Sequence, residues 1–343
     1  MTEQWLILRS GKRLAYDDAP GGPLAACDDM WTHLFDRIIA LRGGEGRIWR
    51  RSTEETAASG VYDTGLREFR GPAFDVDREP GEGWRPDLIV NRGGYGVYAE
   101  ALRRWPSAFR VYYGAGMRYI PRDGLRYDLI LVDTLRQEPD VRAAHPRSLV
   151  RTIFKPAIDD LFAPRGAAKR YDLVILCDGD KPHKGLDWLL PRIPPGLSVL
   201  RIGRPDSSFT KARDEGTLAV TFTGRVPHTE VPALAEQARV GVVCDDGQFD
   251  SGPRILPELL ALGLPVVVRD TVRLNWDRYR HPEFCIPVND RTAARMIART
   301  VARAGGLDGR EHYLKRIGLG PASRAWAHVI QEAMARHGWR PER

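Results

Sequence analysis

Short apolar runs alternate with turns and amphipathic stretches along most of the chain. In the first half, the apolar runs predict strands at residues 5–8, 87–91, 109–113, 128–132 and 149–154. In the second half, they predict strands at residues 172–177, 198–202, 219–222, 240–244, 265–268 and 284–287. Several stretches between them have the spacing of helices: 28–41, 97–104, 229–238, 255–262, 292–303 and 310–317. The stretch 50–85 shows no clear periodicity. Strands that alternate with helices are typical of βα units and parallel sheets.

The length of 343 residues favours two domains over one. The segment 155–170, KPAIDDLFAPRGAAKR, is rich in prolines and small residues and precedes a new strand, as a domain boundary does. We therefore expect an N-terminal Rossmann-like domain over residues 1–155 and a C-terminal one over residues 156–319. A last helix over residues 320–343 follows, with packing back on the N-terminal domain as one option. The predicted fold class is α/β, with the two domains facing each other across a cleft.

Charge and cysteine content narrow the class of protein. Lysine plus arginine number 52 and aspartate plus glutamate 45, a net charge of +7, but acids and bases are interspersed. No aromatic-interleaved basic patch occurs, so we expect no nucleic-acid partner. The four cysteines form no CxxC pair, which favours a reducing cytoplasm. No apolar run is long enough to cross a bilayer, and peripheral contact with the inner face of a membrane stays open.

The strongest candidate for chemistry follows the predicted strand at residues 240–244. A polar loop there carries Asp250, Ser251 and Gly252, and a helix begins soon after. Ligands of parallel α/β sheets bind beyond the carboxyl ends of the strands, and a helix start offers N–H groups to a phosphate. Gly252 allows close approach to the backbone. Glu258 lies about one turn into the helix, where a carboxylate suits two ribose hydroxyls.

Three segments resemble one enzyme family. Residues 222–268 contain an acid, seven residues and a glutamate, and this glutamate is the first residue of ELLALGLPVVV. This spacing resembles the E-x7-E motif of retaining GT-B glycosyltransferases of the GT4 type. CDGDKPHKGLDWLLPRI at 177–193 is similar to the family's lysine-containing segment, and IFKPAIDDLFAP at 153–164 to its interdomain segment. The matches occur in the family's order and cover roughly half of the chain.

The resemblance implies roles for individual residues. Glu258 would bind the ribose, Asp250 the hydroxyls of the donor sugar, and Lys184 the diphosphate, whose growing negative charge a fixed cation stabilises. We expect Lys184 at the rim of a loop, so that replacing it leaves the fold intact. The other implied donor-binding residues are Arg225 and Val226 near the base, Ser251, Gly252, Pro253, Arg254 and Ile255 at the diphosphate, and Lys181.

Two further loops bear on the acceptor and on metal binding. NRGGYG and VYYGAGMRYIP each follow a predicted strand. Acceptors of the resembled family bind on the first domain, so Gly94, Tyr113 and Gly114 are acceptor-side candidates, with tight structural turns as the alternative. Asp178 and Asp180 form a DxD triplet, which either holds a divalent metal or caps a helix. The resemblance favours capping, so we expect no metal.

The resemblance therefore implies a nucleotide-sugar-dependent glycosyltransferase of the hexosyltransferase class. The donor would be a UDP-, GDP- or dTDP-sugar, with no other cofactor, and the reaction would retain the anomeric configuration. The acceptor is an unidentified saccharide, lipid-linked glycan or natural product. Two alternatives stay open: a nucleotide-sugar epimerase of the same fold, and a binding protein that has lost activity. The second is motivated by Gly179, which stands where the family has an arginine that Lys181 could replace. The sequence does not indicate an oligomeric state.

Overall fold

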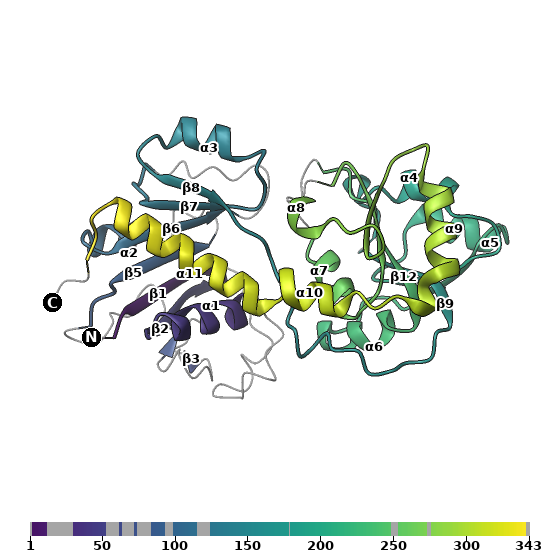
Figure 1. Ribbon diagram of the computed structural model, residues 1–343, viewed down its shortest axis with the longest axis horizontal. Coiled ribbons are helices and arrows are strands. Elements are labelled where there is room, and N and C mark those ends of the chain that lie inside the picture. The colour runs from purple at the N-terminus through teal and green to yellow at the C-terminus, as the bar shows by residue number, and fades with distance from the viewer. Residues whose placement is uncertain are drawn as a thin grey trace. The chain divides into compact units, whose positions relative to one another are not determined.

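The computed structural model describes residues 2–11, 30–52, 62–63, 72–73, 84–92, 99–114, 124–177, 179–247, 253–272 and 276–340. Of the candidate residues, five lie outside these ranges: Gly94, Asp178, Asp250, Ser251 and Gly252. The chain divides into two compact units, Met1–Phe154 with Ala322–Arg343, and Lys155–Pro321 (Figure 1). Within the described ranges, no helix is both long enough and apolar enough to cross a membrane.

The first unit is built on a six-stranded parallel sheet with the order β2-β1-β5-β6-β7-β8. Its strands are β1 (Gln4–Gly11), β2 (Glu45–Ser52), β5 (Leu88–Arg92), β6 (Phe109–Gly114), β7 (Leu129–Val132) and β8 (Leu149–Thr152). A separate antiparallel pair joins β3 (Tyr62–Asp63) to β4 (Pro72–Ala73). The helices are α1 (Met30–Leu41), α2 (Ala99–Arg104), α3 (Glu138–Ala144) and most of α11 (Leu319–Arg336). Every residue of β7 is buried, as expected for a strand covered on both faces.

An aromatic cluster joins α1 and α11 to this sheet. The ring of Trp31 lies 4.5 Å from that of Tyr113 in β6 and 6.0 Å from that of Trp326 in α11. Trp326 also meets Phe35 edge to face at 5.8 Å. All four side chains are almost fully buried. Aromatic pairs with these geometries add about 0.5–1.5 kcal/mol each beyond the burial of their area, so the cluster is a main support of the first unit.

The second unit has a six-stranded parallel sheet with the order β11-β10-β9-β12-β13-β14. Its strands are β9 (Tyr171–Leu176), β10 (Ser198–Ile202), β11 (Ala219–Phe222), β12 (Ala238–Val243), β13 (Val266–Arg269) and β14 (Cys285–Val288). The α-helices are α4 (Leu186–Leu189), α5 (Ser207–Asp214), α6 (Val231–Ala235), α7 (Ile255–Ala261), α8 (Trp276–Tyr279), α9 (Ala293–Arg303) and α10 (Arg310–Arg316). Short 3-10 turns include η3 (Pro182–Lys184), η4 (Leu190–Arg192), η5 (His228–Glu230) and η6 (Ala304–Gly306).

Strand order fixes where a ligand can bind in the second unit. From β9 the chain proceeds outward through β10 to β11, and it then returns to the other side of β9 with β12. In an open parallel sheet, the crevice at such a reversal of strand order is the usual ligand site. The loops that follow β9 and β12 flank this point, and they are the two loops that carry Lys184 and the start of α7.

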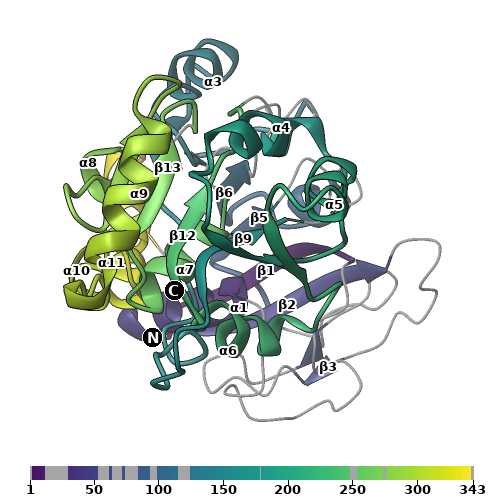
Figure 2. The ribbon, with the colours of Figure 1, turned by 90° about the vertical axis from the view of Figure 1, so that its right-hand side faces the viewer.

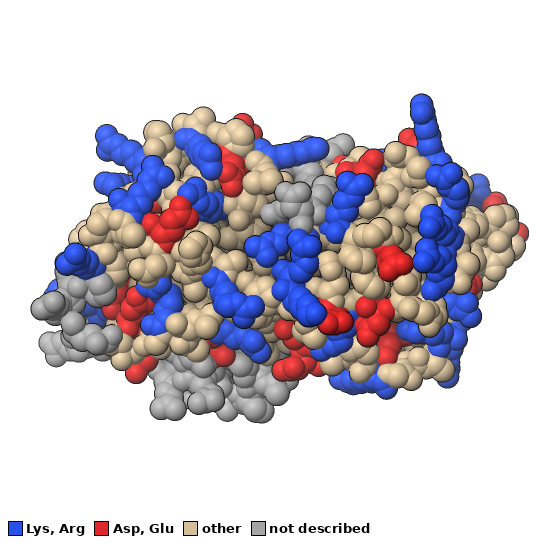
Figure 3. Space-filling model, in the orientation of Figure 1, with Lys and Arg blue, Asp and Glu red and all other residues tan. Residues whose placement is uncertain are grey.

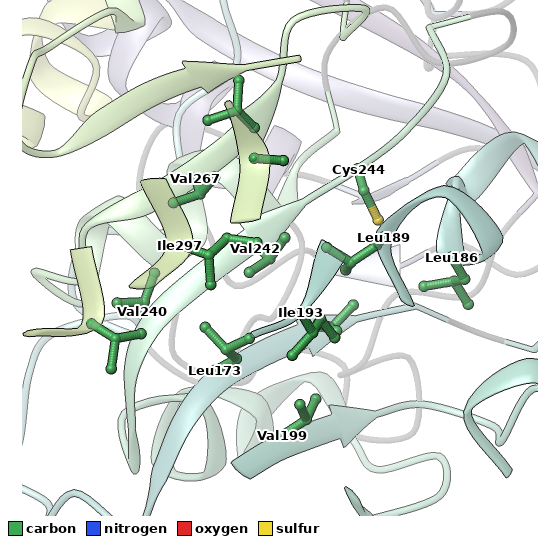
Figure 4. Close-up of a cluster of buried hydrophobic side chains, with 14 of the residues drawn as sticks. Leu173, Leu186, Leu189, Ile193, Val199, Val240, Val242, Cys244, Val267 and Ile297 are labelled. Atoms are coloured by element: carbon green, nitrogen blue, oxygen red, sulfur yellow. The ribbon is translucent and has the colours of Figure 1, made fainter. Parts of the chain in front are cut away.

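A hydrophobic core supports the strands of the second sheet. Leu173, Val199, Val240 and Val267 contribute from four strands, and Ile297 contributes from α9 (Figure 4). Figure 2 shows α9 running alongside β13. Apolar residues recur at helical spacing in α9, so one face of this helix is buried in the core. The predicted α/β class with two Rossmann-like parallel sheets is confirmed.

Candidate functional site

The loops after β9 and β12 touch through their backbones. Gly185 has a φ of +68°, and a Cβ at this position would lie 2.0 Å from the carbonyl oxygen of Cys244. The backbone N–H of Asp246 donates to the carbonyl of His183 at 2.9 Å. The thiol of Cys244 donates to the carbonyl of Lys184 at 3.1 Å. Glycine at position 185 is therefore required both by its left-handed backbone and by this close approach.

Lys184 is held in position by an ion pair across these two loops. Its Nζ atom lies 2.6 Å from Oδ1 of Asp245, the second residue after β12. The side chain of Lys184 is 18% exposed and that of Asp245 only 4%. Lys184 ends η3 in the loop after β9. Because its amine neutralises a buried carboxylate, we expect its replacement to cost stability even where the fold stays intact. An ammonium group has three donors, and the contact with Asp245 fixes the direction of one of them.

Arg269 places a second cation beside Gly185. It is the last residue of β13, and its Nη1 atom lies 3.3 Å from the Cβ position of Gly185. Its guanidinium lies 4.6 Å from the ring centroid of Trp188, a cation–π distance. Our sequence reasoning missed Asp245 and Arg269. The signal available for both was a charged residue at or near the carboxyl end of a buried strand.

Gly179 has a φ of +71° and contacts Arg204. Its N–H donates to the carbonyl of Arg204 at 3.2 Å, and Nε of Arg204 lies 3.8 Å from where a Cβ of Gly179 would stand. Lys181, the cation considered as a substitute for the family's arginine, is exposed and directly precedes η3. The carboxylate of Asp180 accepts from the N–H and the hydroxyl of Ser207 at 2.8 and 3.0 Å, at the start of α5.

Glu258 links α7 to the loop that follows β11. Its side chain is buried, and its Oε1 atom lies 3.0 Å from Nε2 of His228. His228 opens η5, just after Arg225 and Val226, and its ring lies 5.4 Å from that of Phe162. The structure thus connects the candidate ribose residue with the loop expected near the base. Sequence reasoning missed the contact of His228 with Glu258.

The remaining donor-side candidates lie at the start of α7. Arg254 is the N-cap residue, with backbone dihedrals already in the helical region, and Ile255 is the first helical residue. The N–H of Leu256 donates to the carbonyl of Pro253 at 3.1 Å. The first acid of the motif, Asp250, falls outside the described ranges, so the structure describes only the position of the second acid.

On the acceptor side, Tyr113 is fully buried. Its hydroxyl donates to Oδ1 of Asp133 at 2.5 Å, and its ring packs between Trp31 and Trp326. Gly114 is the last residue of β6. The structure therefore gives the Tyr113 side chain a place in the core of the first unit, and its backbone a place at the carboxyl edge of the sheet.

Two thiols, those of Cys177 and Cys244, belong to the hydrophobic core of the second unit. Burial raises the pKa of Cys177, and the nearby cations Arg201 and Lys184 only partly offset this effect. Burial also raises the pKa of Cys244 far above that of an ordinary thiol. Because the thiolate is the reactive form, both side chains stay protonated near neutral pH.

Comparison with known proteins shows similarity at the level of three-dimensional structure. No protein-family model matches the chain, and no curated protein matches it in sequence. Sucrose-phosphate synthase from Thermosynechococcus elongatus aligns with a TM-score of 0.66 at 15% identity, over 97% of this chain and 100% of that chain. HepE from Anabaena in complex with UDP-glucose aligns with a TM-score of 0.61 at 15% identity, over 96% of this chain and 99% of that one. A glycosyltransferase from Rickettsia africae aligns with a TM-score of 0.62 at 10% identity, over 97% and 99%. The chain has the GT-B fold, as predicted.

Proposed function

We propose that this protein transfers a sugar from a nucleotide-sugar donor to an acceptor, with retention, as GT4-type enzymes do. The observation that carries the proposal is the position of Lys184 in the loop after β9, beside β12, where the strand order reverses. Its amine is oriented by Asp245. The solved structures of similar fold support the donor class. HepE was crystallised with UDP and with UDP-glucose, and pneumococcal GtfA, an O-GlcNAc transferase, with UDP and GlcNAc.

Each donor group has a proposed partner in the second unit. Lys184 neutralises the diphosphate, and Arg269 adds positive charge at the same edge. Glu258 accepts the ribose hydroxyls, with His228 fixing the orientation of its carboxylate. The base lies by Arg225 and Val226, and the backbone from Pro253 to Ile255 binds the phosphates. Asp250 contacts the sugar itself.

These cations act on the bond that breaks. As the bond from the anomeric carbon to the diphosphate oxygen lengthens, the nucleoside diphosphate gains negative charge. A fixed cation that is already in place stabilises that charge without reorganisation. The acceptor oxygen bonds to the same face of the anomeric carbon, and its proton passes to the leaving diphosphate. This route needs neither an enzyme nucleophile nor a metal, so EDTA should leave the turnover rate unchanged.

Arg204 bears on the alternative that the protein is an inactive binding protein. Gly179 stands where the resembled family has an arginine, and the guanidinium of Arg204 lies against that glycine. We propose that Arg204 supplies the positive charge from the next strand's loop. Arg204→Met should then weaken nucleoside diphosphate binding about tenfold, as expected for the loss of one charged hydrogen bond. If Arg204→Met binds nucleoside diphosphate as tightly as the wild type does, the alternative of a catalytically impaired binding protein is favoured.

The two motif acids should have separable effects. Glu258→Gln removes a ribose contact that exists equally in the ground state and the transition state, so it should mainly raise the donor KM. Asp250→Asn removes a contact to the sugar as the anomeric carbon becomes electron-poor, so it should mainly lower kcat. If Glu258 only supports the start of α7, its loss would cost about 0.3–1 kcal/mol of stability and leave the donor KM unchanged.

Ligand-induced stabilisation tests the function most cheaply. The protein is melted alone and with UDP-, GDP- and dTDP-sugars. A donor present at about 100 times its Kd should stabilise the fold by about 2.7 kcal/mol. The absence of a shift with every nucleotide would rule out donor binding. Product analysis then separates transfer, which releases the nucleoside diphosphate, from epimerisation, which converts one nucleotide sugar into another.

A further inference from the structure

The exposed face of α9 carries a regular row of arginines. Arg295, Arg299 and Arg303 follow one another at intervals of four residues, and Arg291 precedes the helix at the same interval. We call these four residues the arginine row. A second row of small residues runs beside it: Ala294, Ala298 and Ala302. All seven side chains are exposed, and Figure 3 shows a column of basic side chains over this helix.

Local electrostatics do not favour this arrangement. Like charges four residues apart repel each other on a helix surface. Arg295 also lies in the first turn, where the positive end of the helix dipole disfavours a cation. The helix contains no acidic residue that would compensate. Arg303 pairs with Glu283 at 3.2 Å, whereas Arg291, Arg295 and Arg299 form no ion pair with the residues that the structure describes.

Three other helices carry an acid one turn away from an exposed base. These helices are α3, α5 and α10, where the pairs are Arg142 with Glu138, Lys211 with Glu215, and Lys315 with Glu311. The arginine row differs from these three helices, because no acidic residue of α9 lies beside its bases. A charge pattern that disfavours the isolated helix becomes favourable when an anionic surface covers it.

We propose that the arginine row docks the protein on an acidic lipid surface. A rise of 1.5 Å per residue places the Cα atoms of Arg295, Arg299 and Arg303 about 6 Å apart along about 12 Å of helix. The planar guanidinium suits bidentate contact with the phosphates of lipid headgroups. The neighbouring alanines are short, so the arginines can reach a flat surface unhindered. This inference does not depend on the glycosyltransferase proposal.

The composition of the helix favours lipid over nucleic acid and adsorption over insertion. The α9 sequence contains no aromatic residue on which bases could stack. Its exposed face carries no large apolar side chain that would enter the hydrocarbon region. Binding should therefore be electrostatic, restricted to acidic vesicles and weakened by salt.

The test is co-sedimentation of the full-length protein with phosphatidylcholine vesicles, with and without one third phosphatidylglycerol. The wild type should bind only the acidic vesicles. Arg295→Gln/Arg299→Gln should lower the partition coefficient at least tenfold, since each basic residue near such a surface contributes about fivefold. The matched control Lys211→Gln/Lys315→Gln removes the same charge from exposed sites in the same unit and should change binding less than twofold.

Melting temperatures keep the test interpretable. The Arg295→Gln/Arg299→Gln variant should melt at or above the wild-type temperature, because it relieves repulsion within the helix. Ala298→Glu, which keeps every arginine, should also weaken vesicle binding. The proposal fails if the wild type ignores acidic vesicles or if both double variants lose binding equally. It also fails if a DNA duplex binds the row while vesicles do not.

Discussion

Replacing Lys184 by methionine should lower stability and nucleotide affinity for two different reasons. The Lys184 amine lies 2.6 Å from a carboxylate that is only 4% exposed, on Asp245. A charged hydrogen bond contributes about 1.5–3 kcal/mol, and breaking a fully buried ion pair costs about 3–5 kcal/mol. Lys184 itself keeps some contact with water, so the lower range applies. We expect Lys184→Met to lower the free energy of unfolding by about 2–3 kcal/mol.

A second substitution separates the two effects. Lys184→Met/Asp245→Asn removes both charges, so no buried carboxylate loses its counter-charge. The double variant should be more stable than the sum of the single effects by about 1–2 kcal/mol, a coupling expected of contacting residues. Its affinity for nucleoside diphosphate should nevertheless stay about 10- to 100-fold below that of the wild type. Asp245→Asn alone should keep or strengthen that affinity, because it leaves the cation in place.

Two measurements separate the effect on stability from the effect on nucleotide affinity. Urea denaturation gives the free energy of unfolding, and calorimetric titration with UDP and GDP gives affinity. Lys211→Met serves as the control, because its 3.8 Å pair with Glu215 is exposed and should contribute less than about 0.5 kcal/mol. Recovery of wild-type nucleotide affinity in the double variant would refute the reasoning. Lys184 would then be only a structural partner of Asp245.

Further predictions concern backbone approach and pH. Gly185→Ala should destabilise the protein by more than about 3 kcal/mol in urea denaturation, because its Cβ would collide with the Cys244 carbonyl. Gly196→Ala, also at positive φ but with open space around it, should cost only about 1–2 kcal/mol. Burial lowers the pKa of His312, with His281 and a neighbouring arginine acting in the same direction. The unfolded chain therefore takes up this proton more readily, and stability should fall as pH drops below about 6.5. Melting curves of His312→Phe should show a weaker loss at acid pH, and an unchanged pH dependence would contradict this.

Apolar patterning was sufficient to predict most of the second sheet. The run predicted at residues 198–202 coincides with β10, and the run at 240–244 overlaps β12, which spans Ala238–Val243. Buried central strands of parallel sheets are almost continuously apolar, so they are visible in sequence. The edge strand β2 was missed because its sequence, EGRIWRRS, is rich in arginine. An edge strand pairs on one side only, here with β1, and tolerates such composition.

The candidate site was predictable only where one segment carries the chemistry. Lys184 and Glu258 were found from motifs within short stretches. Their partners Asp245 and His228 lie 61 and 30 positions away. These pairs meet because β9 lies beside β12, and because the loop after β11 reaches α7. No periodicity in the sequence records the order of strands in a sheet, so these contacts required the structure.

A crystal structure of the full-length protein with a bound nucleotide sugar tests the central claim most directly. The account predicts the diphosphate within hydrogen-bond distance of the Lys184 amine and the ribose hydroxyls on the Glu258 carboxylate. It also predicts the sugar hydroxyls on Asp250. A donor bound with both carboxylates more than about 6 Å from every sugar and ribose hydroxyl, well beyond hydrogen-bond reach, would contradict it.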